Sequence, residues 1–240
     1  MMTTIFTMSE VCCGAKRTGE SHKERNKRCE DAVLAKEYPF GVILAVSDGV
    51  GSHRYARTGA NAIVRAVHMT FTELAACGLH EEKIGDRIVR HYAEIVPANK
   101  HSQAAATCLY AAHLYGIGLF IGQAGDGMIC CETEGKQIKM EEPKTESRNE
   151  VSPVISDPEK VIWRTEIIED QNIGKIRLML MTDGISEEIV PGKEHDMMNF
   201  LEEKLSVRKN KQNRVLKLLL RKELDTMSKD DKTIAVYCRG

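Results

Sequence analysis

The chain has 240 residues, 42% of them apolar, and a formal net charge of −1. This length and apolar content suffice for a substantial buried core, and no low-complexity linker divides the sequence, so we expect a single domain over residues 1–240. Basic residues are spread among acidic ones, which argues against nucleic acid as a partner. No apolar stretch reaches membrane-spanning length and the N-terminus lacks the order of a signal peptide. We expect a cytoplasmic monomer with no membrane partner.

The first third of the chain predicts strands and then a pair of helices. We expect a short strand at 4–8, a polar stretch at 14–28, and a hairpin of strands 32–36 and 41–47. Beyond this hairpin the apolar residues change to a helical period. They predict a long amphipathic helix from Ala56 to about Gly78, and a second, antiparallel helix over 81–96, which Pro97 ends.

The remainder of the chain alternates short apolar segments with glycines, then returns to helical patterns. Residues 104–140 predict consecutive antiparallel strands, and the Pro-, Ser- and charge-rich stretch 141–160 predicts a surface flap. The elements expected after it are strands at 161–168 and 176–181, helices at 195–205 and 213–227, and a last strand at 233–237. This order indicates an α+β protein in which antiparallel sheets pack face to face and helices cover the outside.

The eight cysteines indicate buried, reduced thiols. None is spaced Cys-x-x-Cys, and Cys12-Cys13 and Cys130-Cys131 are adjacent pairs, which rarely bridge each other. We interpret His113, within an apolar strand, and Trp163 as residues of the core. His53, Arg54 and Arg57 fit an exposed first helical turn.

Acidic residues stand at the ends of several predicted strands. Three apolar runs stop at Asp-Gly, namely at Asp48-Gly49, Asp126-Gly127 and Asp183-Gly184. Two further runs begin just after acidic pairs, one directly after Glu30-Asp31 and one a single residue after Asp230-Asp231. Carboxylates at strand ends can converge on one point, where they repel one another unless a hard divalent cation is bound.

Taken in order, these motifs resemble the metal-dependent serine/threonine protein phosphatases of the PP2C (PPM) type, most of all the compact bacterial branch. The resemblance spans nearly the whole chain, and the segments that carry it are Glu30-Asp31-Ala32, Ser47-Asp48-Gly49-Val50-Gly51-Ser52, Ala106-Thr107, Ala124-Gly125-Asp126-Gly127, Thr182-Asp183-Gly184-Ile185 and Asp230-Asp231-Lys232-Thr233. It implies a four-layer α-β-β-α sandwich of two antiparallel sheets flanked by helix pairs, with two or three Mg²⁺ or Mn²⁺ ions at the strand ends.

The resemblance also implies a role for each acidic position. Asp48 corresponds to the carboxylate that bridges two metals, with the Gly49 carbonyl as a further ligand. Asp183 and Asp230 correspond to the other ligands of the first metal.

The second and third metals take the remaining positions. Glu30 and Asp31 match the acidic pair that holds the second metal, directly or through waters, and Asp126 matches the ligand of a third metal in bacterial members. Asp231 is a neighbour of the ligand Asp230 by this comparison.

The sequence departs from the family pattern near the substrate. Val50 stands where larger members carry a histidine, a candidate general acid, which leaves protonation of the leaving group to a metal-bound water. The usual phosphate-binding arginine falls on Asn26, so the phosphate-binding candidates are the neighbouring Arg25 and Arg28 together with His22.

These features predict hydrolysis of phosphoserine and phosphothreonine in proteins by a metal-activated water, with a phosphorylated protein as the partner. Neither a nucleophilic serine motif nor a cysteine phosphatase loop is recognisable. Two alternatives stay open on the sequence: a non-catalytic PP2C-like regulatory or binding module, and a phosphohydrolase that acts on a small phosphorylated molecule.

Overall fold

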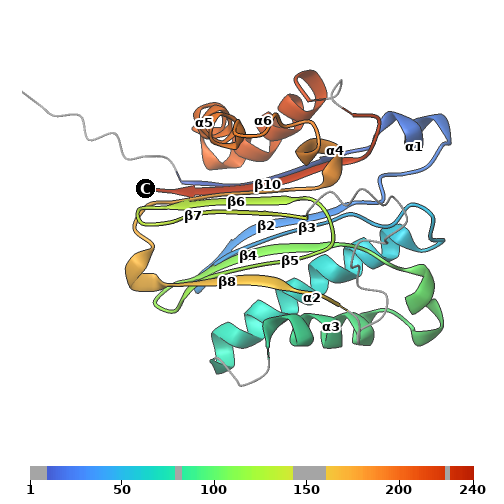
Figure 1. Ribbon diagram of the computed structural model, residues 1–240, viewed down its shortest axis with the longest axis horizontal. Helices are drawn as coiled ribbons and strands as arrows, with labels where there is room; N and C mark the ends of the chain where they lie inside the picture. The colour runs from blue at the N-terminus through green and yellow to red at the C-terminus, as the bar shows by residue number, and fades with distance from the viewer. Residues whose placement is uncertain (1–9, 79–82, 143–160, 225–227) are drawn as a thin grey trace, which may run out of the picture.

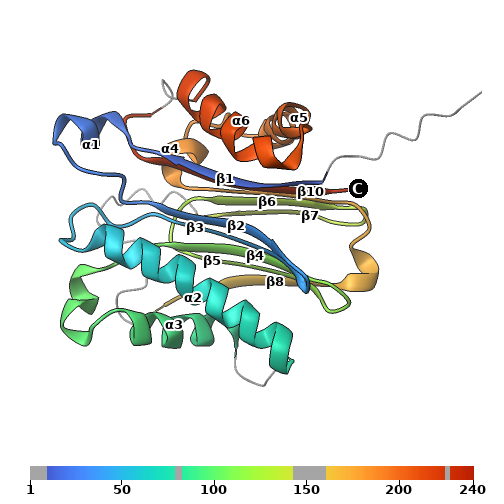
Figure 2. The same ribbon diagram turned by 180° about the vertical axis from the view of Figure 1, so that it is seen from behind.

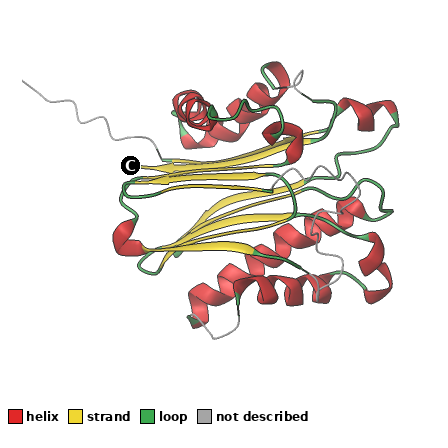
Figure 3. Cartoon of the chain, viewed as in Figure 1, coloured by secondary structure: helices red, strands yellow, loops and turns green. Residues whose placement is uncertain are grey.

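The structure, a computed structural model, describes residues 10–78, 83–142, 161–224 and 228–240. These residues form two five-stranded antiparallel sheets that pack face to face, with a pair of helices on each outer face (Figures 1 and 3). The expected four-layer sandwich is confirmed. Within the described parts of the chain, none of the helices could span a lipid bilayer.

The first sheet, here called sheet B, has the strand order β2-β3-β4-β5-β8. Its strands are β2 (Ala32–Tyr38), β3 (Gly41–Ser47), β4 (Cys108–Leu114), β5 (Gly118–Ala124) and β8 (Arg164–Glu169). Helices α2 (Ala56–Cys77) and α3 (Ile84–Ile95) cover its outer face (Figure 2). One face of α2 carries Ala60, Ile63, Val67 and Phe71, all fully buried against this sheet, as the helical period predicts.

The second sheet, sheet A, has the order β1-β10-β9-β6-β7. Its strands are β1 (Val11–Arg17), β10 (Lys232–Arg239), β9 (Ile176–Met181), β6 (Met128–Thr133) and β7 (Gln137–Glu141). Its outer face is covered by α5 (Glu194–Leu205) and α6 (Lys209–Lys222). The short elements at the ends of strands are α1 (Glu20–Glu24), α4 (Asp183–Ser186), η1 (Ala98–Gln103) and η3 (Asp170–Asn172).

Three apolar layers stabilise this arrangement: one between the sheets and one under each helix pair. Phe120 and Tyr110 are buried under α2 and α3, while Tyr237 is buried between the sheets. His113 is buried, as expected, with Nδ1 3.4 Å from the Tyr237 hydroxyl and Nε2 3.2 Å from Asp170. All eight cysteines are free thiols, and six are buried.

Several expected elements differ from the structure. Residues 4–8 and most of the expected flap lie outside the described residues. The first described strand is Val11–Arg17, which overlaps the polar stretch expected at 14–28. It forms a strand because pairing with β10 buries Val11 and alternate residues after it. Residues 104–140 form consecutive strands in antiparallel pairs, as predicted, but the pair β4–β5 belongs to sheet B and the pair β6–β7 to sheet A. Gly125 and Gly127 have φ of 91° and 99°, a conformation that suits glycine and turns the chain from one sheet to the other.

Candidate metal centre

Strand register brings the acidic residues of sheet B to one end of the sandwich. Asp31 precedes β2 and Asp48 follows β3. Because Ala32 pairs with Ser47 in the antiparallel ladder, the two carboxylates leave the sheet side by side. This is the end at which α1 and α4 lie, opposite the C-terminus in Figure 1.

The acidic residues of sheet A meet them at the same end. Strand β9 pairs with both β10 and β6, and its last residue is aligned with the beginning of each. Asp183 therefore follows β9 close to Asp126, which precedes β6, and to Asp230 and Asp231, which precede β10. The packing of the two sheets places both sets of carboxylates around one point.

Two glycines make this close approach sterically feasible. A Cβ on Gly49 would lie 2.5 Å from the carbonyl oxygen of Ala56 and 3.0 Å from that of Glu30. A Cβ on Gly184 would lie 2.0 Å from the carbonyl oxygen of Asp231. The glycine after each of these strand-end aspartates thus lets a neighbouring backbone segment pack against the site.

The carboxylates are close enough to perturb one another. Burial, then the negative charges of Asp31 and Asp183, raise the pKa of Asp48 to about 11. Burial, then Asp126 and Asp230, raise the pKa of Asp183 to about 8. Burial raises the pKa of Asp31 to about 6 and also raises that of Asp126. Without counter-ions this cluster is electrostatically unfavourable.

The donor set fits hard divalent cations. Oδ1 of Asp31 and Oε2 of Glu30 are buried and have no hydrogen-bond partner. Buried carboxylate oxygens that accept no hydrogen bond are costly, and a cation is the partner that satisfies several of them together. Mg²⁺ and Mn²⁺ prefer an all-oxygen set of this kind.

Two threonines hold the carboxylates in place. The Thr107 hydroxyl accepts a hydrogen bond from the Asp48 backbone N–H at 2.9 Å, and the Thr107 N–H donates to the Asp48 carbonyl at 2.8 Å. The Thr182 hydroxyl donates to Oδ2 of Asp31 at 3.1 Å and accepts from the backbone N–H of Thr233 at 3.1 Å. Both threonines belong to the strand-end motifs of the sequence, but their hydrogen bonds cannot be predicted from it.

Asp231 is buried and acts as a hydrogen-bond acceptor for two other segments. Its Oδ1 accepts from the backbone N–H of Gly19 at 2.7 Å, and its Oδ2 accepts from that of Glu30 at 2.6 Å. The neighbouring Asp230 is exposed. Asp231 thereby ties the start of β10 to α1 and to the loop that carries the Glu30-Asp31 pair.

The phosphate-binding candidates occupy α1 and the loop after it. His22 is partly buried, with Nε2 3.4 Å from Oε2 of Glu30 and Nδ1 2.9 Å from Oδ2 of Asp231. Arg25 and Arg28 are exposed on the loop that leads to β2. The structure thus brings His22 to the acidic cluster and leaves the two arginines at the surface near it.

The position of His53 differs from the sequence-based expectation. Helix α2 begins at Ala56, so His53 lies in the turn before it and not in an exposed first helical turn. Its backbone N–H donates to the carbonyl of Val50 at 2.8 Å, and its Nδ1 is buried without a hydrogen-bond partner. Arg54 and Arg57 are exposed, as expected.

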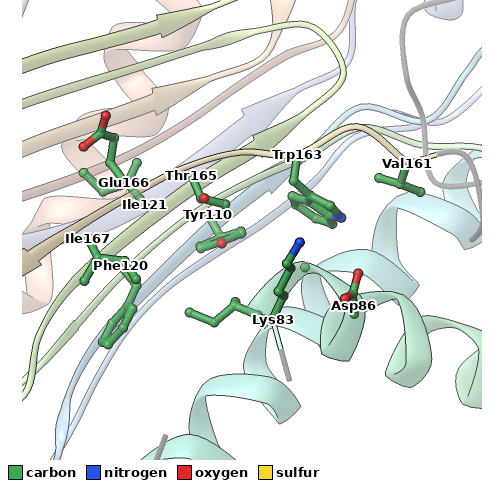
Figure 4. A pocket seen from close by; sticks show the side chains of 12 residues that line it. Lys83, Asp86, Tyr110, Phe120, Ile121, Val161, Trp163, Thr165, Glu166 and Ile167 are labelled. Atoms are coloured by element: carbon green, nitrogen blue, oxygen red, sulfur yellow. The ribbon is translucent and has the colours of Figure 1, made fainter. Parts of the chain in front are cut away.

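A separate cavity of about 540 Å³ lies between α3 and β8. Lys83 and Asp86, at the start of α3, face Tyr110 and the partly buried Trp163 across it (Figure 4). None of the strand-end carboxylates lines this cavity. The acidic cluster and the cavity are therefore distinct features.

Comparisons with known proteins agree with the architecture. A family model described as protein phosphatase 2C matches residues 18–225. No curated protein sequence matches the chain. The structure of the S. agalactiae serine/threonine phosphatase is similar with a TM-score of 0.64 and 13% identity, over 97% of this chain and 100% of that one.

Two metal-bound structures are similar over comparable lengths. RsbX in complex with magnesium gives a TM-score of 0.60 at 15% identity, over 97% of this chain and 100% of that one. The catalytic domain of the phosphatase PstP in complex with 2 manganese ions gives 0.60 at 16% identity, over 95% and 97%. At these identities the structures share the fold, and the family match over residues 18–225 decides the classification. The chain belongs to the protein phosphatase 2C family.

Proposed function

We propose that the protein hydrolyses phosphoserine and phosphothreonine in proteins by means of a water activated by two or three Mg²⁺ or Mn²⁺ ions. The observation that carries this proposal is the convergence of strand-end carboxylates from both sheets on one point, where two buried carboxylate oxygens accept no hydrogen bond. A purely structural role does not account for a cluster in which these groups raise the pKa of one another.

Each acidic residue has an assigned place in this proposal. Asp48 and the Gly49 carbonyl would serve two ions, and Asp183 and Asp230 would complete the first site. Glu30 and Asp31 would hold the second ion, directly or through waters, and Asp126 would hold a third. Bound ions would lower the pKa of a bridging water and neutralise charge on the transferring phosphoryl group.

Other residues near the cluster would bind the substrate, and the buried cysteines disfavour a covalent route through a thiol. His22, Arg25 and Arg28 supply positive or hydrogen-bonding groups for the phosphate beside the acidic cluster. Val50 carries no proton to donate, so the leaving oxygen takes its proton from water. Burial raises the pKa of the Cys131 thiol to about 12, and six of the eight cysteines are buried, which disfavours a cysteine nucleophile.

The first experiment measures Mn²⁺-dependent hydrolysis of p-nitrophenyl phosphate by the wild type, Asp48→Asn and Asp183→Asn. We expect each substitution to lower kcat by more than about 100-fold, since changes even outside the first coordination shell cost about 10- to 100-fold. Asp196→Asn is a matched control, because this exposed α5 carboxylate pairs only with Lys193 among the described residues. A wild type without activity, or full activity in both site variants, contradicts the catalytic proposal and favours a non-catalytic binding module.

The second experiment identifies the substrate class. Release of phosphate is measured with phosphoserine and phosphothreonine peptides, nucleotides and sugar phosphates at equal concentration. The proposal predicts higher kcat/KM for the phosphopeptides. A preference for a nucleotide or sugar phosphate contradicts the protein-substrate part of the proposal and leaves the metal chemistry in place.

A further inference from the structure

One thiol lies inside the acidic cluster. Cys29, Asp31 and Asp231 are all buried, and one ligand atom of each lies within 4.8 Å of the others. Cys29 and Asp31 flank Glu30 on the loop before β2, whereas Asp231 comes from the start of β10. Two segments far apart in the sequence therefore place a sulfur and two carboxylates around one small volume.

One carboxylate oxygen at this position has no hydrogen-bond donor. Asp31 is fully buried, and its Oδ1 accepts no hydrogen bond from the described residues. His22 lies beside the group, with Nδ1 2.9 Å from Oδ2 of Asp231, but it is not one of the three residues whose ligand atoms converge. The buried Oδ1 of Asp31 is therefore available as a ligand.

The surroundings of Cys29 differ from those of the chain's other buried thiols. Cys108 and Cys131, for example, pack within the apolar layers under α2 and between the sheets. Cys29 belongs to none of the three apolar layers formed by the described residues. Its neighbours are charged groups, so apolar packing does not explain a cysteine at this position.

A sulfur together with carboxylate oxygens is a donor set that Zn²⁺ accepts, whereas Mg²⁺ takes oxygen ligands. We propose that Cys29, Asp31 and Asp231 bind Zn²⁺ or a similar borderline-soft divalent cation next to the Mg²⁺/Mn²⁺ centre, with solvent as the fourth ligand. On binding, the Cys29 thiol gives its proton to solvent and the sulfur donates an electron pair to the metal, with no change of oxidation state.

This site shares Asp31 with the centre assigned above. Zn²⁺ bound through Cys29 competes for the Asp31 carboxylate and so inhibits the enzyme at Mg²⁺ or Mn²⁺ concentrations that otherwise support activity. Only this inhibitory consequence rests on the proposed phosphatase function. The binding of Zn²⁺ itself does not depend on it.

Binding is tested on the metal-free full chain with Co²⁺ as a spectroscopic probe for Zn²⁺. A thiolate ligand gives Co²⁺ a charge-transfer band in the near ultraviolet, and Zn²⁺ removes this band by displacement. We expect the band in the wild type and in Cys131→Ser, which replaces another buried thiol elsewhere, and its loss in Cys29→Ser. An identical band in Cys29→Ser, or no band in the wild type, overturns the proposal.

A second measurement covers the case in which Cys29→Ser does not fold, as judged by circular dichroism. Zn²⁺ affinity is measured by competition with a chromogenic chelator in the wild type and in Asp231→Asn. We expect the affinity to fall by more than about 10-fold, as the loss of a metal ligand requires. Unchanged Zn²⁺ affinity in Asp231→Asn and in any folded Cys29 variant contradicts the assigned ligands.

Inhibition is measured separately, as the ratio of Mn²⁺-supported activity with and without Zn²⁺ within each variant. We expect a Zn²⁺ concentration for half-inhibition more than about 10-fold higher in Cys29→Ser than in the wild type. An inactive wild type that still shows the Cys29-dependent Co²⁺ band refutes the proposed phosphatase function but not the Zn²⁺ site. An active wild type without the band refutes the Zn²⁺ site alone.

Discussion

Replacing Asp48 by asparagine should stabilise the metal-free protein. In the folded state burial, Asp31 and Asp183 raise the pKa of this carboxyl from 3.8 to about 11. At pH 7 the folded protein must therefore hold a proton on Asp48 that the unfolded chain has lost. Taking up this proton on folding lowers the free energy of unfolding by about 1.4 kcal/mol for each of the roughly three pH units between the unfolded pKa and pH 7. The total loss at pH 7 is about 4 kcal/mol at most.

The predicted pH dependence has a definite sign. Because the folded pKa is the higher one, the wild type is most stable relative to Asp48→Asn below pH 3.8 and loses stability as the pH rises from there towards 11. Asparagine keeps the shape of the side chain but does not titrate. In EDTA at pH 7 we expect the variant to have a free energy of unfolding about 2–4 kcal/mol higher, and the difference to shrink towards pH 4.

The assay is urea unfolding followed by circular dichroism, in EDTA and in Mn²⁺. Mn²⁺ should stabilise the wild type far more than the variant, because binding to the folded state alone raises stability. The Asp196→Asn control should stay within about 0.5 kcal/mol of the wild type in both conditions. A variant that is no more stable than the wild type in EDTA, or that gains as much from Mn²⁺, would refute this account of the cluster.

Three further predictions follow from the residues around the carboxylates. Thr182→Val removes the hydroxyl that donates a hydrogen bond to Asp31, and we expect the free energy of unfolding in urea to fall by about 1–3 kcal/mol. Gly184→Ala places a Cβ against the Asp231 carbonyl and should lower stability by about 1–3 kcal/mol in the same assay, whereas an unchanged midpoint contradicts the close packing. Arg25→Ala should raise KM for a phosphopeptide more than it lowers kcat in steady-state kinetics, and an unchanged KM would remove Arg25 from the phosphate site.

Much of the fold follows from local pattern. The helical period after the first hairpin predicts α2 closely, and the Tyr38–Gly41 link predicts the β2–β3 turn. Strand β1 is missed because its apolar alternation is short and its identity as a strand depends on pairing with β10 at the other end of the chain. The residues of β6 likewise do not show which sheet this strand joins. Its sheet depends on the glycines before it, which turn the chain.

Part of the candidate site can be predicted from the sequence, and part of it cannot. The acidic residues are visible in the sequence because each stands at a strand end next to a recognisable motif. The residues that hold them are not, because their hydrogen bonds join distant positions: Thr182 bonds a residue 151 positions away, and Asp231 bonds the Glu30 N–H across 201. Cys29 reads as an ordinary buried thiol until Asp231 is placed beside it.

The most direct test of the metal centre is anomalous diffraction at the manganese absorption edge from crystals grown with Mn²⁺. The account predicts two or three anomalous peaks among the strand-end carboxylates, as expected of a two-metal hydrolase, with Asp48 contacting two of them. Crystals that show no peak at this cluster, or manganese bound only elsewhere on the protein, would contradict it.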